Sequence, residues 1–106
     1  MIGEEKILKA ARILAEAAGP AKVILFGSYA RGDATEDSDL DFLIIEKNVE
    51  NQREEMSRLQ KTLYPLGIYA DVLVYSEAEA EGKKNWCSTA LYWALREGKV
   101  LHDTIG

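Results

Sequence analysis

Two short motifs in the first half of the chain combine the residue types needed to handle a phosphate ester. The first is a Gly-Ser turn, Gly27-Ser28, which directly follows the apolar run of residues 23–26. The second is an Asp-x-Asp pair, Asp39 and Asp41, which begins after ten intervening residues. A glycine turn allows the backbone to approach phosphate oxygens closely, and paired carboxylates are ligands for hard divalent cations. This spacing indicates nucleotidyl transfer.

The Gly-Ser turn is expected to bind phosphate. Residues 23–26 are predicted to form a short buried strand, which ends at Gly27. Ser28 is a good N-cap for a short helix over residues 29–32, and a helix N-terminus presents unpaired N–H groups and positive potential to anions. Arg31 adds a fixed positive charge nearby. We therefore expect Gly27, Ser28 and Arg31 to contact a nucleotide.

The Asp-x-Asp pair lies on a second expected strand, residues 39–45. Because side chains alternate between the two faces of a strand, Asp39 and Asp41 point the same way. Neighbouring carboxylates repel each other unless they are protonated or bind cations, and Mg²⁺ favours such oxygen ligands together with substrate phosphates. Asp71 opens a third expected strand, residues 70–75, and is the candidate third acid if that strand neighbours the second. The three aspartates suit two-metal transfer chemistry.

Each motif also has an ordinary structural explanation. A lone Gly-Ser turn is most often only a turn, and an Asp-x-Asp pair can be two solvated carboxylates on an edge strand. Their combination at this spacing, with a further acid on a later strand, favours a nucleotide and metal site over coincidence. The remaining carboxylates of this region fit less well, because they fall in the intervening loop or at the far end of the strand: Asp33, Glu36, Asp37 and Glu46.

The whole pattern resembles the nucleotidyltransferase superfamily, whose members share the polymerase-beta-like fold. The size of the chain is similar to the minimal nucleotidyltransferase branch, many members of which are antitoxins encoded beside HEPN-domain toxins. The resemblance implies that Gly27 and Ser28 hold the triphosphate of ATP. It implies that Asp39 and Asp41 bind both Mg²⁺ ions and that Asp71 is the third acid, which ligates one metal and promotes attack on the α-phosphate. No acid of the motif is replaced, which favours activity.

The resemblance further implies an Mg²⁺-dependent enzyme that transfers AMP from ATP to a hydroxyl. Larger relatives hold the acceptor in a second domain, whereas the 106 residues here suit one minimal nucleotidyltransferase domain over residues 1–106. The acceptor is therefore expected in trans, and a tyrosine of a HEPN-domain partner is the implied target. Two alternatives remain: a binding module that neutralises its partner by occlusion, and a small-molecule nucleotidyltransferase of the kind that modifies an antibiotic.

Composition limits the partners and the compartment. The net charge is −5, and no basic patch is evident, which argues against a nucleic-acid polymer as the main partner. The single cysteine, Cys87, allows no disulfide within the chain and is expected to be a small buried residue, which fits a reducing cytoplasm. The apolar runs are far shorter than the ~18 residues of a membrane span, so no membrane role is expected.

The rest of the chain predicts an α/β fold in which helices pack on a small mixed sheet. The expected elements outside the motifs are a helix over residues 3–18, a helix over residues 51–63, a helical turn that starts at Ser76, a last helix over residues 86–97 capped by Asn85, and a short final strand at residues 100–101.

The last of these helices carries an apolar arc wider than the stripe of an ordinary surface helix. One interpretation is a helix buried in the core. The other is a surface patch for a partner or for self-association into a homo-oligomer, with Trp86, Tyr92 and Trp93 as anchors. His102 near the end of the chain is expected to be structural or exposed, neither a ligand nor a base.

Overall fold

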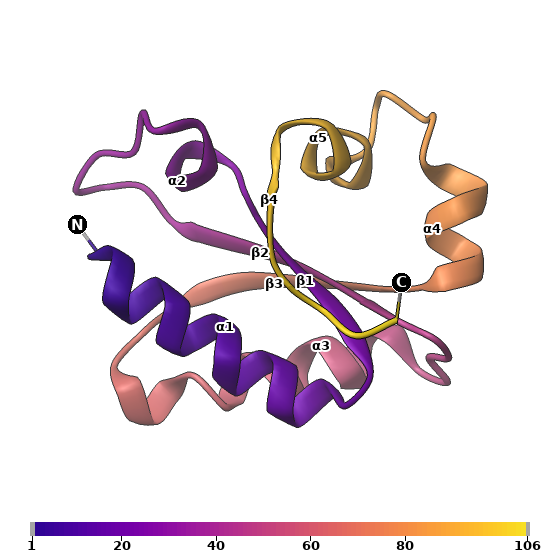
Figure 1. Cartoon of the computed structure of the whole chain (residues 1–106), viewed down its shortest axis with the longest axis horizontal. Helices are drawn as coiled ribbons and strands as arrows, with labels where there is room; N and C mark the ends of the chain where they lie inside the picture. Colours follow the sequence, from indigo (N-terminus) through magenta and orange to yellow (C-terminus); the bar gives the residue numbers. More distant parts are fainter. Residues whose placement is uncertain (1, 106) are drawn as a thin grey trace.

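The computed structural model describes residues 2–105 and contains a four-stranded mixed sheet with helices on both faces (Figure 1). The strand order is β3-β2-β1-β4, with β2 parallel to β3 and β1 antiparallel to both β2 and β4. The expected class, a small mixed sheet packed with helices, is confirmed. The strands are β1 (Ala21–Phe26), β2 (Leu40–Glu46), β3 (Ala70–Ser76) and β4 (Lys99–Asp103).

One face of the sheet is covered by α1 (Glu4–Ala18) and α3 (Gln52–Lys61), which lie together below the sheet in Figure 1. Apolar residues at helical spacing on α1 and α3 meet alternate residues of the strands. The centre of this layer consists of fully buried side chains from both helices and the sheet, among them Leu14, Phe42 and Leu59.

The other face carries α4 (Glu77–Lys83) and α5 (Ala90–Glu97), while the single turn α2 (Ser28–Arg31) follows β1 at one end of the sheet. The second core layer lies between this face and the two helices, and includes Leu43, Leu91 and Ala94. Because β2 is covered on both faces, its residues 42–46 are all buried, which explains their uninterrupted apolar sequence up to Glu46.

The final helix begins later than the sequence predicts. It starts at Ala90 and not at Trp86, and its cap is Thr89 and not Asn85, because the Thr89 hydroxyl accepts a hydrogen bond of 3.2 Å from the Tyr92 N–H. The preceding segment forms turns, in which the Trp86 N–H donates to the Lys83 carbonyl at 3.0 Å.

This late start changes the environment of the apolar residues. Leu91 and Ala94 are buried, whereas Trp86 and Trp93 are 57% and 49% exposed. The expectation that Cys87 is buried is wrong, because it lies in the exposed turn before the helix. The helix is therefore amphipathic, and part of its wide apolar arc faces solvent.

Smaller differences affect the other elements. α3 ends at Lys61 and is followed by a 3-10 helix, Tyr64–Leu66, which contains Pro65. α4 is capped by Ser76 as expected and continues through Gly82. The last strand is longer than residues 100–101 and lies at one edge of the sheet. No helix in the described part of the chain has the length and hydrophobicity that a membrane span requires.

Candidate active site

The predicted acids meet at the end of the sheet where β1 finishes and β2 and β3 begin. In the strand register, Asp41 lies between Phe26 of β1 and Asp71 of β3. Adjacent strands are about 4.8 Å apart, so two acids in direct register are close neighbours. The condition set for Asp71, that the third strand lies beside the second, is met, and the parallel pairing of β2 with β3 brings Asp71 to Asp41.

Both acids emerge on the face of the sheet that carries α5. Asp41 shares its face with Leu43, and Asp71 shares its face with Leu73, because residues two apart on a strand point the same way. Leu43 and Leu73 belong to the core layer under α4 and α5. Asp41, Asp71 and Ala90, the first residue of α5, line one cavity. The carboxylates therefore open toward the start of that helix.

Asp39 lies just outside the strand that the sequence predicts to contain it. β2 begins at Leu40, and Asp39 is an exposed residue of the preceding loop. Its negative charge still acts on Asp41, because it contributes to the raised pKa of that residue. A loop position leaves the Asp39 side chain free to adjust toward a ligand, in contrast to the two strand acids.

The charges of all the other candidate site residues with charged side chains, Asp39, Asp71 and Arg31, act on the carboxyl group of Asp41. Burial raises the pKa of Asp41 to about 6, the charges of Asp71 and Asp39 contribute to this rise, and Arg31 opposes them. The site therefore carries more negative charge than its surroundings neutralise. Crowded carboxylate oxygens of this kind fit a hard divalent cation. Within residues 2–105, no three acidic, His or Cys side chains form a ready-made metal cage, so substrate phosphates would have to complete such a shell.

The Gly-Ser turn approaches the acids closely. Gly27 has φ +77°, a conformation that favours glycine, and a Cβ atom at this position would collide with Oδ2 of Asp41. Gly27 itself is the N-cap of α2, and Ser28 is the first helical residue, so the expectation that Ser28 caps this helix is wrong. The first helical bonds run from Ala30 and Arg31 to the Gly27 carbonyl, both at 3.1 Å.

The N–H groups of Ser28 and Tyr29 precede these first helical bonds, at the end of β1 where the turn meets the acids. α2 has only four residues, so individual N–H groups and not a long helix dipole would bind phosphate here. The turn and the acids together form one polar surface, in which donors lie beside carboxylates. Such an arrangement can hold a triphosphate whose charge is shared between the donors and a cation.

Arg31 lies at the rim of this surface. Its side chain contacts Asp33 at 3.3 Å and Glu97 of α5 at 3.4 Å, and all three groups are exposed. The positive charge of Arg31 nevertheless lowers the pKa of Asp41. The structure thus places Arg31 near the acids while two other carboxylates hold its guanidinium.

A second cavity lies next to the acids, and part of its lining comes from residues outside the two sequence motifs. It is lined by Phe26, Gly27, Arg31, Ala90, Trp93 and Glu97, and it shares Phe26 and Ala90 with the cavity that contains the acids. Trp93 stands out in the sequence only as an aromatic residue suited to an interface. The spacing of the motifs says nothing of Trp93, because the packing of α5 on the sheet brings it beside Gly27.

Comparison with known proteins agrees with this geometry, since the sequence profile of the nucleotidyltransferase domain matches residues 6–92. The chain belongs to the nucleotidyltransferase family. A protein from Methanocaldococcus jannaschii described as a candidate protein adenylyltransferase is 41% identical over 81 residues, 76% of this chain and 77% of that protein.

Solved structures share the fold of this nucleotidyltransferase. One is a toxin–antitoxin complex with AMP-PNP, which matches 97% of this chain and 75% of that one with a TM-score of 0.60 and 22% identity. Another is a complex of a tri-AMPylated Shewanella oneidensis HEPN toxin with its MNT antitoxin, which matches 95% of this chain and 70% of that one with a TM-score of 0.53 and 20% identity.

Proposed function

We propose that this nucleotidyltransferase transfers AMP from ATP to a tyrosine hydroxyl of a HEPN-domain partner and so acts as an antitoxin. The observation that carries the proposal is the register of Asp41 with Asp71 at the sheet end that Gly27 closes. Carboxylates beside a phosphate-binding turn are what the chemistry requires. The protein adenylyltransferase relative and the AMPylated toxin complex support the choice of AMP and of a protein acceptor.

In this proposal the turn binds the nucleotide through its backbone. The N–H groups of Ser28 and Tyr29 donate to phosphate oxygens, and Gly27 allows those phosphates to approach Asp41. Asp39, Asp41 and Asp71 would hold Mg²⁺, which supplies charge stabilisation for the entering and leaving oxygens. Arg31 at the rim adds a positive charge near the outer phosphates.

Asp71 is placed to serve the acceptor. It is exposed and lies on β3, one of the two edge strands of the sheet, whereas Asp41 lies on the adjacent inner strand. Asp71 can therefore orient an incoming hydroxyl and accept its proton. The hydroxyl oxygen forms a bond to the α-phosphorus, the bond from that phosphorus to the bridging oxygen breaks, and pyrophosphate leaves. An exposed edge position allows the acceptor to belong to a second protein.

The experiment that tests this function is intact mass spectrometry of the partner encoded by the adjacent gene. The partner is incubated with this protein, ATP and Mg²⁺, and a gain of one or more AMP units is expected. Asp39→Asn and Asp71→Asn should abolish the gain, whereas Asp37→Asn, a matched change at an exposed loop acid, should leave it intact. A partner in which the modified tyrosine is replaced by phenylalanine should gain no mass.

A second function, neutralisation by occlusion, is favoured by one observation. Trp86, Trp93 and Leu95 expose large apolar side chains around α5, a composition typical of interface anchors. The same experiment separates the two functions. A tight complex without any mass gain would contradict adenylylation and favour occlusion. Self-association through residues 86–97 stays a prediction.

A further inference from the structure

We propose that Trp93 is the surface on which the nucleobase stacks, and that the cavity between α2 and α5 is the base-binding part of the nucleotide site. This inference rests on the proposed function, because it presupposes that the aspartates and the Gly27 turn bind a nucleotide triphosphate. It adds the residue that contacts the base, which none of the motifs identifies.

The first argument is that the two cavities are adjacent. One is lined by Asp41 and Asp71, the other by Gly27 and Trp93, and both are lined by Phe26 and Ala90. A molecule bound to the acids therefore lies next to the cavity that Trp93 lines. The ligand that fits needs an anionic part at the acids and the turn, and a flat apolar part at the indole. A nucleotide has both parts.

The second argument is that the indole of Trp93 is already held in place. Its Nε1–H donates to the Cys87 carbonyl at 3.1 Å, and the Tyr92 ring meets it edge-on at 5.0 Å with an interplanar angle of 83°. Although these contacts fix the ring, the residue is 49% exposed. A fixed ring with an open surface binds a flat partner at a small cost in side-chain entropy.

The third argument comes from the distribution of charge in the second cavity. Its charged residues, Arg31 and Glu97, pair with each other at 3.4 Å at the rim. The remaining lining is backbone, aromatic or methyl groups: Phe26, Gly27, Ala90 and Trp93. Apart from Gly27 and Arg31, which serve the phosphates in the proposed function, this lining offers no partner to a phosphate group, whereas a base has two aromatic residues to contact.

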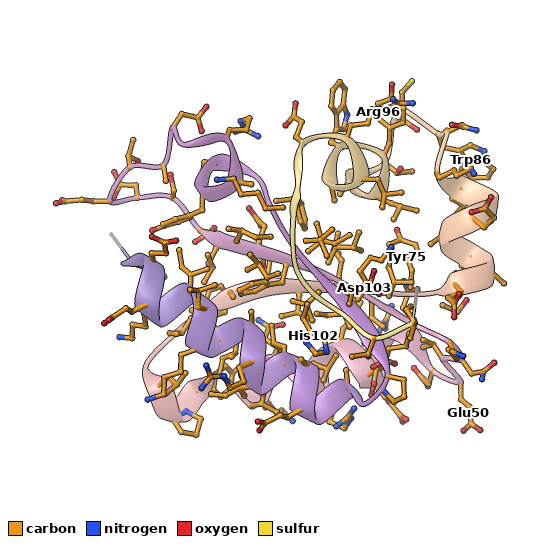
Figure 2. All side chains as sticks on the ribbon, in the orientation of Figure 1. Glu50, Tyr75, Trp86, Arg96, His102 and Asp103 are labelled. Atoms are coloured by element: carbon orange, nitrogen blue, oxygen red, sulfur yellow. The ribbon has the colours of Figure 1, made fainter. Side chains whose placement is uncertain are left out.

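The other exposed tryptophan provides a matched control. Trp86 is 57% exposed, precedes α5, and has the ammonium of Lys83 at 6.0 Å from its ring centroid. Figure 2 shows Trp86 on the side of the molecule that carries α4. Neither of the two cavities is lined by Trp86. Loss of its indole should therefore leave nucleotide affinity unchanged.

The test compares two ligands, ATP and inorganic tripolyphosphate, each titrated with Mg²⁺ by calorimetry. Trp93→Ala should raise the Kd for ATP by about tenfold, because a stacked base contributes about that factor to affinity. The same variant should leave the Kd for tripolyphosphate unchanged, because that ligand has no base. Trp93→Phe should restore most of the ATP affinity, and Trp86→Ala should match the native protein for both ligands.

A second measurement needs no loss of the side chain. In Trp86→Phe, Trp93 is the sole indole, and stacking should quench its fluorescence on addition of ATP but not of tripolyphosphate. Unchanged ATP affinity in Trp93→Ala, or an equal loss for both ligands, would overturn the inference. Native protein that binds ATP without transferring AMP would contradict the proposed function alone, whereas failure to bind either ligand would overturn both.

Discussion

Gly27 lies directly against the carboxylate of Asp41, which occupies the space that a side chain on Gly27 would need. The two residues are brought together by the register of β1 with β2, in which Phe26 lies opposite Asp41. A Cβ atom on Gly27 would collide with Asp41 Oδ2, and its φ of +77° already favours glycine. The glycine thus serves both the turn and the position of the central acid.

Gly27→Ala should therefore lose activity out of proportion to its loss of stability. Displacement of Asp41 or of the turn by about 1 Å should lower AMP transfer by about a hundredfold. The strained backbone should also cost about 1–3 kcal/mol in unfolding free energy. The measurements are the transfer rate and thermal unfolding of the same variant.

Gly19→Ala is the matched control, since Gly19 has φ +75° but no atom lies within 4 Å of the place that an added methyl group would occupy. It should share the stability loss while it keeps the native transfer rate. If both variants lose activity equally, the contact of Gly27 with Asp41 is not what the reaction requires.

Arg31 should contribute a charge to nucleotide binding without being indispensable. Arg31→Ala should weaken ATP affinity by about fivefold, as expected for an exposed charged group. The difference from the native protein should shrink at high salt, because exposed charges are screened. Arg96→Ala is the control, because the Arg96 guanidinium stacks on the Tyr92 ring at 4.2 Å and Arg96 lines neither of the two cavities. Equal ATP affinities for native protein and Arg31→Ala would remove Arg31 from the nucleotide site.

The cap of α5 should matter for nucleotide binding as well as for stability. Thr89→Ala removes the hydroxyl that accepts from the Tyr92 N–H and should cost about 1 kcal/mol of unfolding free energy. Because Ala90 lines both cavities, a loosened first turn of α5 should also raise the Kd for ATP. Calorimetry with ATP and thermal unfolding measure the two effects.

Ser76→Ala supplies the comparison for this cap. Ser76 caps α4 through the same type of bond, at 3.2 Å to the Glu79 N–H, but it lies at the opposite end of β3 from Asp71. It should lose similar stability while ATP affinity stays native. A parallel loss of affinity in both variants would mean that cap strength acts only through global stability.

Glu46 should make the fold sensitive to alkaline pH. It is buried at the far end of β2, and burial together with the neighbouring Glu55 raises the pKa of Glu46 to about 8, against the opposing effect of Arg58. No N–H or O–H group within residues 2–105 donates to Glu46 Oε2, whereas the protonated carboxyl can itself donate to Glu55. Ionisation of Glu46 would leave two carboxylates in contact.

The raised pKa of Glu46 determines whether stability rises or falls with pH. The folded state binds the proton more tightly than the unfolded chain, so the stabilisation is present at low pH and is lost as pH rises from about 4.5 toward 8. Native protein should therefore melt at a lower temperature at about pH 9 than at about pH 6, with a loss of the order of 2 kcal/mol. Glu46→Gln should flatten this dependence and melt higher at the alkaline end.

Glu50→Gln is the control for this prediction. Glu50 lines a cavity together with Glu46 and Glu55, but it is exposed, and Figure 2 shows it at this end of the molecule. It should keep the native pH dependence. A melting temperature of Glu46→Gln that falls with pH as steeply as that of the native protein would assign the dependence to other groups.

The motifs of this chain could be interpreted from local sequence because their chemistry is local. The Gly-Ser turn, the alternation that sets which face of its strand Asp41 occupies, and the capping of α4 by Ser76 each depend on residues within a few positions of one another. Asp39 is the exception, because β2 begins only at Leu40. The family match over residues 6–92 confirms the family that these residues resemble. The roles of the individual aspartates stay predictions until they are tested.

The boundaries that the sequence misplaced are those where local signals compete. Asn85 and Thr89 are both capable caps, and the bond from the Tyr92 N–H selects Thr89. Cys87 and Trp86 consequently lie in the turn before α5, where both are exposed. Helical periodicity alone cannot decide such a start, because the same apolar residues fit both.

Residue type and short spacing were enough to predict the acids, the turn and the chemistry they suit, because that information lies within a few positions of the chain. The packed molecule was needed to show that Asp71 lies in register with Asp41, that Gly27 makes room for Asp41, and that Trp93 lines a cavity with Gly27. These relationships join segments that are distant along the chain. They depend on which strands pair and where a helix packs, and those choices are made by the whole core and not by any one segment.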